Sequence, residues 1–83
     1  MKYRARVEIS LKSGLSDPEG ETSAASLRDL GYKVSGVSTG KVYYIRLEAG
    51  SMEEAHGKVE EMCRRLLANP VRDDCKIQLE KME

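Results

Sequence analysis

The stretch over residues 51–71, SMEEAHGKVEEMCRRLLANPV, constrains the fold more than any other part of this 83-residue chain. Ser51 stands at an N-cap position, and Glu54 three residues later completes a capping box. Pro70 cannot continue a helix, so the helix is predicted to end near Ala68. The apolar residues recur at steps of three and four, which places them on one helix face; they are Met52, Ala55, Val59, Met62, Cys63, Leu66 and Leu67. Such a helix needs a flat apolar surface to pack against.

Four segments are predicted to be β-strands that supply this surface. Residues 2–12 alternate between apolar and polar side chains, the pattern of a strand with one buried and one solvated face. Residues 32–38 and 41–48 flank a tight turn at Thr39-Gly40 and are expected to form an antiparallel hairpin. Residues 75–80 alternate again and are predicted to be the last strand, followed by a charged tail that frays.

A second, shorter helix is predicted between the first two strands. Asp17 can cap it, Pro18 occupies its first turn without costing a hydrogen bond, and Gly31 suits the left-handed position that ends it. The element order is therefore β-α-β-β-α-β, the ferredoxin-like order. We expect an α+β fold of two layers, an antiparallel sheet with two helices on one face.

The length allows one domain over residues 1–83, and the composition predicts self-association as a dimer or tetramer. Four Tyr with neither Trp nor Phe make a light core. Tyr43 and Tyr44 are consecutive in a strand, so one ring should lie on the sheet face that the helices do not cover. Leu66 is placed in the core, where Leu66→Ala would cost about 2–5 kcal/mol.

Composition also excludes several functional classes. Fourteen basic and fourteen acidic residues cancel, which argues against nucleic-acid binding. No apolar run reaches the ~20 residues of a membrane span, and no apolar segment follows Met1-Lys2 as it would in a signal peptide. Two cysteines outside a CxxC pair are expected to be reduced thiols. We therefore expect a cytoplasmic protein with no membrane and no nucleic-acid partner.

The residues suggest no catalytic or metal site of the chain's own. His56 has no apparent carboxylate or nucleophile partner, and Cys63 lies on the apolar helix face, where burial raises a thiol's pKa. Asp73-Asp74-Cys75 are adjacent rather than at ligand spacing, and no phosphate-binding glycine motif occurs. We expect a binding or assembly module with no bound cofactor.

One short segment is a candidate contact site. Ser38-Thr39-Gly40-Lys41 combines a glycine turn with a cation that could receive a phosphate or a partner's carboxylate, although a simple hairpin turn also explains it. Lys41 is the candidate interface or anion contact. Gly40, Asn69 and Pro70 are expected to shape the same kind of interface.

Several segments also resemble a known family, in order and with its spacing. Residues 11–20 read LKSGLSDPEG, residues 30–32 read LGY, and Val34, Val37 and Gly40-Lys41 follow. Residues 61–71 contain EMC and LLANPV. These segments resemble the LKxGVxDPQG, LGY…V..VRxGK and CxxLLANPVIE motifs of the small PurS subunit of phosphoribosylformylglycinamidine synthase. The resemblance covers almost the whole chain.

The chain departs from these motifs at four positions. Ser38 stands where the family usually has Arg, which leaves an anion contact there to Lys41 alone. Glu19 replaces a common Gln. Arg72 and Cys75 replace an apolar residue and an aromatic one, which puts family-specific packing at that end in doubt.

The resemblance implies a non-catalytic assembly subunit of an ATP- and glutamine-dependent carbon–nitrogen ligase in de novo purine (IMP) biosynthesis. It implies two partners, the glutaminase subunit PurQ, which releases ammonia, and the synthetase subunit PurL, which uses ATP and magnesium. The small subunit would bridge them and support ammonia transfer.

Two other functions remain open from the residues. One is a stand-alone ferredoxin-like regulatory module that binds a small ligand between the sheets of a dimer. The other is RNA binding across the sheet with Tyr43 or Tyr44 as a stacking platform, which lacks a basic surplus and an aromatic-rich motif.

Overall fold

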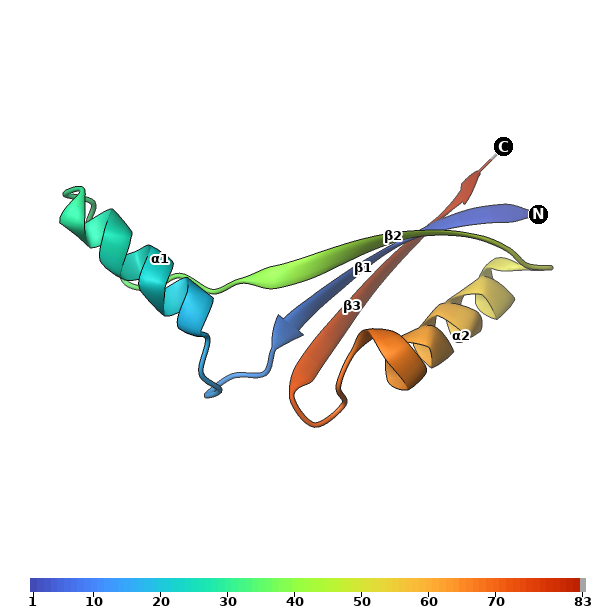
Figure 1. Ribbon diagram of the computed structural model, residues 1–83. Coiled ribbons are helices and arrows are strands. Elements are labelled where there is room, and N and C mark those ends of the chain that lie inside the picture. Colours follow the sequence, from blue (N-terminus) through green and yellow to red (C-terminus); the bar gives the residue numbers. More distant parts are fainter. Residues whose placement is uncertain (83) are drawn as a thin grey trace.

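A three-stranded antiparallel sheet is the centre of the structure, a computed structural model that describes residues 1–82 (Figure 1). The strand order is β2-β1-β3, so β1 is the central strand. The elements along the chain are β1 (Lys2–Leu11), α1 (Pro18–Asp29), β2 (Gly40–Glu48), α2 (Met52–Met62), the π-helical turn η1 (Cys63–Leu67) and β3 (Asp73–Met82). The α+β class, the antiparallel sheet and the two helices are confirmed. The expected fraying of the tail is not seen at Lys81 and Met82, which belong to β3; Glu83 lies outside the described residues.

The core forms where α2 packs across the inner face of β1 and β3. Alternate residues of β1 point toward α2, and four of them are buried: Tyr3, Ala5, Val7 and Ile9. The fifth, Leu11 at the end of the strand, is half-buried. Ala55, Val59 and Cys63 meet them from the helix and from the start of η1. The inner face of β2 contributes Tyr43, Ile45 and Leu47, which are only partly buried. The predicted amphipathic pairing of helix and sheet is therefore confirmed for α2.

The start of α2 is capped nearly as expected. The Ser51 hydroxyl accepts a hydrogen bond from the Glu54 backbone N–H at 3.1 Å. The Glu54 carboxylate reaches back one residue further than a capping box requires, because it accepts from the backbone N–H of Gly50. The first bond satisfies one of the free backbone donors that every helix start leaves, and the second satisfies the N–H of the residue before the cap.

The end of α2 widens into η1, and this change removes Leu66 from the core. The Ala68 N–H donates to the Cys63 carbonyl at 2.9 Å, a bond that spans five residues instead of four. Because of the wider turn, Leu67 follows Cys63 on the side that packs against the core, and the Leu66 side chain is 83% exposed. The chain then leaves the helix with extended angles at Ala68, as predicted. The expected burial of Leu66 is wrong.

The predicted strand over residues 32–38 does not form. This segment has no regular secondary structure, so the order is β-α-β-α-β, and Thr39-Gly40 is the approach to β2 rather than a hairpin turn. Its apolar residues do not alternate strictly, and it includes Gly36. The side chain of Arg28 holds it instead, donating to the carbonyl groups of Val34 at 3.1 Å and Ser35 at 3.4 Å.

Helix α1 lies beyond the end of the sheet rather than on its face, so only α2 covers the sheet (Figure 1). In α1 only Gly20 and Ala24 are buried, and Leu30 just after it is 75% exposed. The radius of gyration is 16.4 Å, against about 12 Å for a compact domain of this length. The expected placement of two helices on one face therefore holds for one of them, because no strand over residues 32–38 brings α1 back across the sheet.

Asp17 joins α1 to the segment that enters β2. Its carboxylate caps α1 by accepting from the Gly20 N–H at 2.9 Å. It also accepts from the Thr39 N–H at 2.7 Å and from the Thr39 hydroxyl at 3.0 Å. These bonds, first from Gly20 and then from Thr39, lower the pKa of Asp17 below its ordinary value of 3.8. A side chain at Gly20 would collide with the Val37 carbonyl oxygen, so this junction requires glycine.

Val59→Ala should lower the free energy of unfolding by about 1–3 kcal/mol, because the Val59 side chain is fully buried between α2 and the sheet. Leu66→Ala is the matched control and should change it by less than about 0.5 kcal/mol, because its side chain is exposed. Urea denaturation of both variants tests this difference. Equal losses for the two variants would contradict the placement of the π-helical turn.

Asp17 should contribute stability that depends on pH. Because the folded carboxylate has a lowered pKa, the unfolded chain binds the proton more readily, and protonation favours unfolding. The contribution is present above pH 3.8 and is lost as the pH falls through the folded pKa. The melting temperatures of the wild-type protein and Asp17→Asn, measured from about pH 6 to about pH 2, should therefore converge at low pH. A constant difference between them would disprove this role.

Candidate functional site

The predicted contact residues Gly40 and Lys41 lie at one end of the sheet, where β2 begins. In the register of the sheet, Gly40 is opposite Ser10 and Lys41 is opposite Ile9. The Lys41 ammonium lies 5.9 Å from the centre of the Tyr43 ring, and among residues 1–82 it forms no ion pair. This leaves an exposed cation available at the end of the strand.

The loop between η1 and β3 lies at the same end of the sheet, and Asn69 shapes it. The side-chain oxygen of Asn69 accepts a hydrogen bond from the Val71 N–H at 3.0 Å, and the backbone carbonyl of Asn69 accepts one from the Asp73 N–H at 2.7 Å. Asp73 returns a bond by accepting from the Asn69 N–H at 2.9 Å. The Arg72 carbonyl accepts from the Lys12 N–H at 2.9 Å, which ties the loop to the end of β1. Asn69 therefore sets the shape of this loop, and its role at an interface stays a prediction.

A hollow of about 350 Å³ brings the two segments together. Gly40 and Lys41 line it from β2, while Leu67 lines it from η1, Arg72 from the loop and Asp73 from the start of β3. Asn69 and Pro70 belong to this loop but do not line the hollow. The sequence predicted that any anion contact here would fall to Lys41 alone, yet Arg72 supplies a second cation. Arg72 departs from the family motif, and sequence reasoning did not use this departure as a signal for the second cation.

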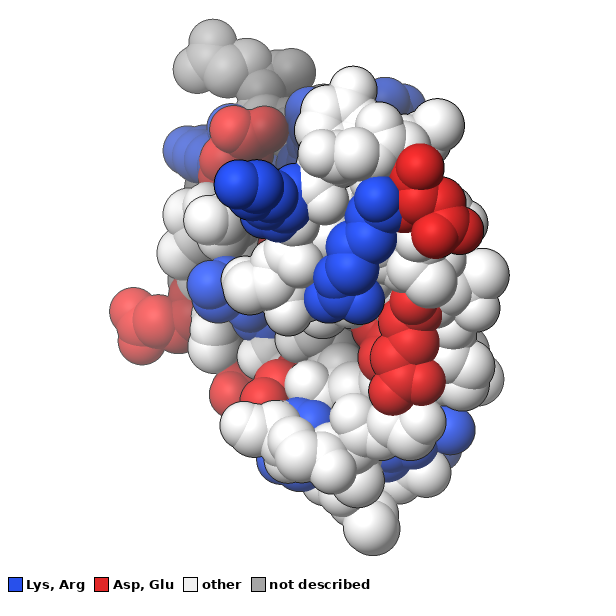
Figure 2. All heavy atoms as spheres, turned by 90° about the vertical axis from the view of Figure 1, so that its left-hand side faces the viewer, with Lys and Arg blue, Asp and Glu red and all other residues white. Residues whose placement is uncertain are grey.

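The charges of this hollow are mixed. Arg72 Nε lies 3.6 Å from Asp73 Oδ1, and Glu19 contributes a further carboxylate to the lining. Figure 2 shows the molecule from the α1 side, with Lys and Arg side chains interspersed with Asp and Glu side chains. The arrangement can therefore contact polar groups of both signs.

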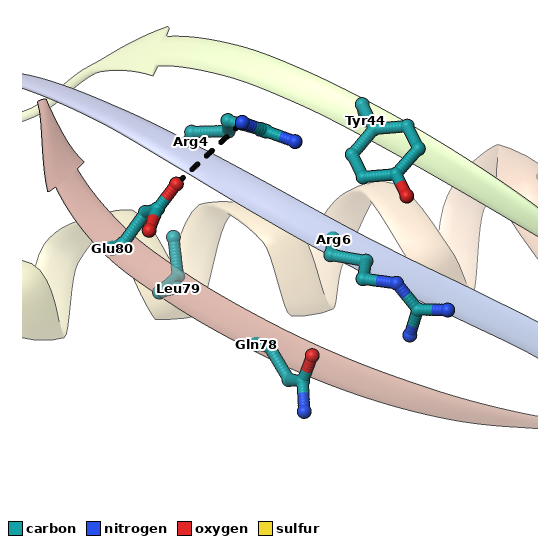
Figure 3. Close-up of a pocket in the computed structure, with 6 residues that line it drawn as sticks. All are labelled: Arg4, Arg6, Tyr44, Gln78, Leu79 and Glu80. Carbon is teal, nitrogen blue, oxygen red and sulfur yellow. Dashed lines mark ion pairs between the residues drawn. The ribbon is translucent and has the colours of Figure 1, made fainter.

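The uncovered face of the sheet carries a second hollow, of about 290 Å³ (Figure 3). Arg6, Tyr44 and Gln78 project from the three strands on this face, and α2 lies behind the sheet. The Arg4 guanidinium stacks 4.9 Å above the Tyr44 ring, an arrangement that a cation and an aromatic face favour. Arg4 also lies 3.7 Å from the Glu80 carboxylate.

Tyr44 confirms the prediction that one of the paired tyrosines faces away from the helices. It is 60% exposed, whereas Tyr43 faces the core. The alternation of β1 placed Arg4 and Arg6 on the same polar face, but sequence reasoning did not select them. Only the register, in which Arg6 is opposite both Tyr44 and Gln78, makes them neighbours of those residues.

The other candidate residues lie apart from both hollows. His56 Nδ1 lies 3.3 Å from Glu60 Oε1 on the exposed side of α2. Burial raises the pKa of the Cys63 thiol to about 12. Within residues 1–82, no group of three or more His, Cys, Asp and Glu side chains is placed to hold a metal ion. In the same part of the chain, no helix is long and apolar enough to cross a membrane.

Comparison with known proteins gives a consistent result. Residues 4–81 match the family model described as PurS, phosphoribosylformylglycinamidine (FGAM) synthase. The FGAM synthase subunit PurS of Archaeoglobus fulgidus is 56% identical over 68 residues, 81% of this chain and 85% of that protein. The crystal structure of Methanocaldococcus jannaschii PurS is 44% identical, with a TM-score of 0.86 over 98% of this chain and 99% of that one.

An assembled relative is similar as well. A chain in the structure of PurLQS from Thermotoga maritima has a TM-score of 0.88 and 28% identity, over 96% of this chain and 99% of that one. The family model matches residues 4–81, and these relatives cover 81% and 98% of this chain. The chain belongs to the PurS family of FGAM synthase subunits.

Proposed function

We propose that this chain is the non-catalytic assembly subunit of FGAM synthase in de novo purine (IMP) biosynthesis. The observation that carries the proposal is the similarity, over 96% of the chain, to a chain of the PurLQS assembly. The contact surfaces support it: a hollow of mixed charge at the end of the sheet and a polar, arginine-bearing face on its uncovered side. Both are suited to docking against other chains.

In this role the chain bridges a glutaminase subunit, PurQ, and a synthetase subunit, PurL, in the cytoplasm. Ammonia released at one active site must reach the other without loss to water, and a subunit interface can provide a protected route. ATP and magnesium are used by the synthetase, and this chain binds no cofactor. The chain positions the two other subunits and encloses the route between their active sites, and it supplies no reacting group.

Self-association as a dimer or tetramer is part of the same proposal. The strand order leaves the outer edges of β2 and β3 unpaired within the described chain, and unpaired edges favour pairing with another strand. The inner face of β2 lies partly uncovered beside α2, while Leu30 and Tyr32 at the end of α1 are exposed. A second copy would cover apolar surface that one chain cannot bury.

The alternative of a regulatory module has one observation in its favour. The hollow with Arg4, Arg6 and Tyr44 could receive a small anion or a planar ring. This function predicts a saturable rise in melting temperature with a nucleotide or an amino acid in the absence of other subunits.

The deciding experiment is the activity of PurL and PurQ with and without this chain. We expect glutamine-dependent activity to be lost without it, while ammonia-dependent activity is retained, because the chain couples two active sites. Loss of both activities would instead mean that the chain stabilises the synthetase itself. If neither activity changes, the proposed function is wrong and the regulatory alternative is preferred.

Lys41→Ala should weaken binding to the partner subunits by about 3- to 10-fold, as expected for one exposed interface charge. The melting temperature should change little, because Lys41 is exposed, forms no ion pair within residues 1–82 and only borders the Tyr43 ring. The matched control is Lys81→Ala, an exposed lysine at the other end of the sheet, opposite Tyr3. Titration at two salt concentrations measures both variants. Unchanged assembly and activity in Lys41→Ala would refute the role of this residue.

A further inference from the structure

The fold brings the two cysteines of the chain into direct contact. Cys63 is buried at the start of η1, and Cys75 lies in β3, 12 positions later. In the register of the sheet Cys75 is opposite Ile9, on the face that α2 covers. The two Sγ atoms are 2.8 Å apart, although both thiols are free.

This separation is close to what a covalent bond requires. The sulfur atoms of a disulfide are about 2.05 Å apart, so bond formation needs a movement of less than about 1 Å. The two residues also differ in access. Cys63 is 5% exposed, whereas Cys75 is an exposed residue that a small molecule can reach.

We propose that Cys63 and Cys75 form an intramolecular disulfide when the protein meets a small oxidising disulfide such as oxidised glutathione. The sequence predicted two reduced thiols, because their spacing is not that of a CxxC pair. The proximity arises from the packing of η1 on β3, which spacing alone does not reveal. This inference does not depend on the proposed function.

The reaction proceeds by two thiol–disulfide exchanges. The exposed Cys75 thiolate attacks oxidised glutathione, forms a mixed disulfide and releases one glutathione thiolate. Cys63 then loses its proton to solvent, attacks the Cys75 sulfur and releases the second glutathione. The protein loses two protons and two electrons, and one glutathione disulfide is reduced to two thiols.

The order of the steps follows from the surroundings of the two thiols. Burial raises the pKa of Cys63 to about 12, so its thiolate is scarce and Cys75 reacts first. The second step is intramolecular between neighbouring atoms, and this proximity compensates for the small thiolate fraction.

The disulfide would enclose the loop between η1 and β3. That loop contains the turn shaped by Asn69, and it supplies Arg72 to the hollow beside Lys41, which Asp73 lines from the start of β3. A covalent tie across its base restricts the unfolded chain and holds the loop at the candidate interface. Oxidation therefore acts on the same end of the sheet as the proposed partner contact.

The test is to incubate the wild-type protein with oxidised glutathione and measure its intact mass and free thiols. We expect the loss of two hydrogen atoms, no remaining titratable thiol, and a cross-linked peptide that joins Cys63 to Cys75. The melting temperature should rise by at least about 5 °C, and dithiothreitol should reverse the change. A stable glutathione adduct on the wild-type protein, or a disulfide between two chains, would overturn the proposal.

Two variants serve as matched controls. Cys63→Ala should retain a glutathione adduct on the exposed Cys75, because no neighbouring thiol can displace it. Cys75→Ala should remain unmodified, because its one thiol is buried. Oxidation should raise the melting temperature of neither variant. If Cys63→Ala does not fold, the wild-type mass and Cys75→Ala still decide, and a similar rise in melting temperature in Cys75→Ala would contradict the disulfide.

Discussion

The burial of one face of the central strand under α2 is the contact on which the rest of the structure depends. The inner residues of β1 are buried, and Val59 meets them from the helix. Because β1 pairs with both neighbours along nearly its whole length, this single contact also positions β2 and β3. Outside this contact, individual hydrogen bonds hold the chain. Some are local, such as the Asp17 cap of α1 and the Asn69 turn beside β3, and others join distant segments, such as the bond from the Thr39 N–H to Asp17.

Those local features were the ones that sequence could predict. The caps at Ser51 and Asp17 depend on side chains that bond their own backbone a few residues away. The end of α1 is of the same kind: Gly31 has a φ of 98°, and the Tyr32 N–H donates to the Leu27 carbonyl at 3.0 Å. The strict alternation of β1 likewise fixed which of its faces is buried.

The features that sequence missed depend on distant parts of the chain. A strand over residues 32–38 needs a partner edge, and its pattern does not specify one. Leu66 lies outside the core because the hydrogen bond from the Ala68 N–H to the Cys63 carbonyl spans five residues and shifts the apolar stripe. No residue type in this segment predicts such a bond. At the candidate site, Lys41 was predicted, but its neighbour Arg72 comes from a loop about thirty residues later and is placed by the sheet register. The contact between Cys63 and Cys75 arises in the same way.

The elongated shape has a thermodynamic consequence. The molecule extends 51 × 29 × 14 Å, and α1 gains little from the sheet that it leaves behind. Because α1 makes few contacts with the rest of the chain, its stability depends by mass action on the chains that bind it. In an assembly subunit, the stability of α1 would then rise with the logarithm of the concentration of the partner chains. Folding of this end of the molecule and binding of the partner chains would then be coupled in a single equilibrium.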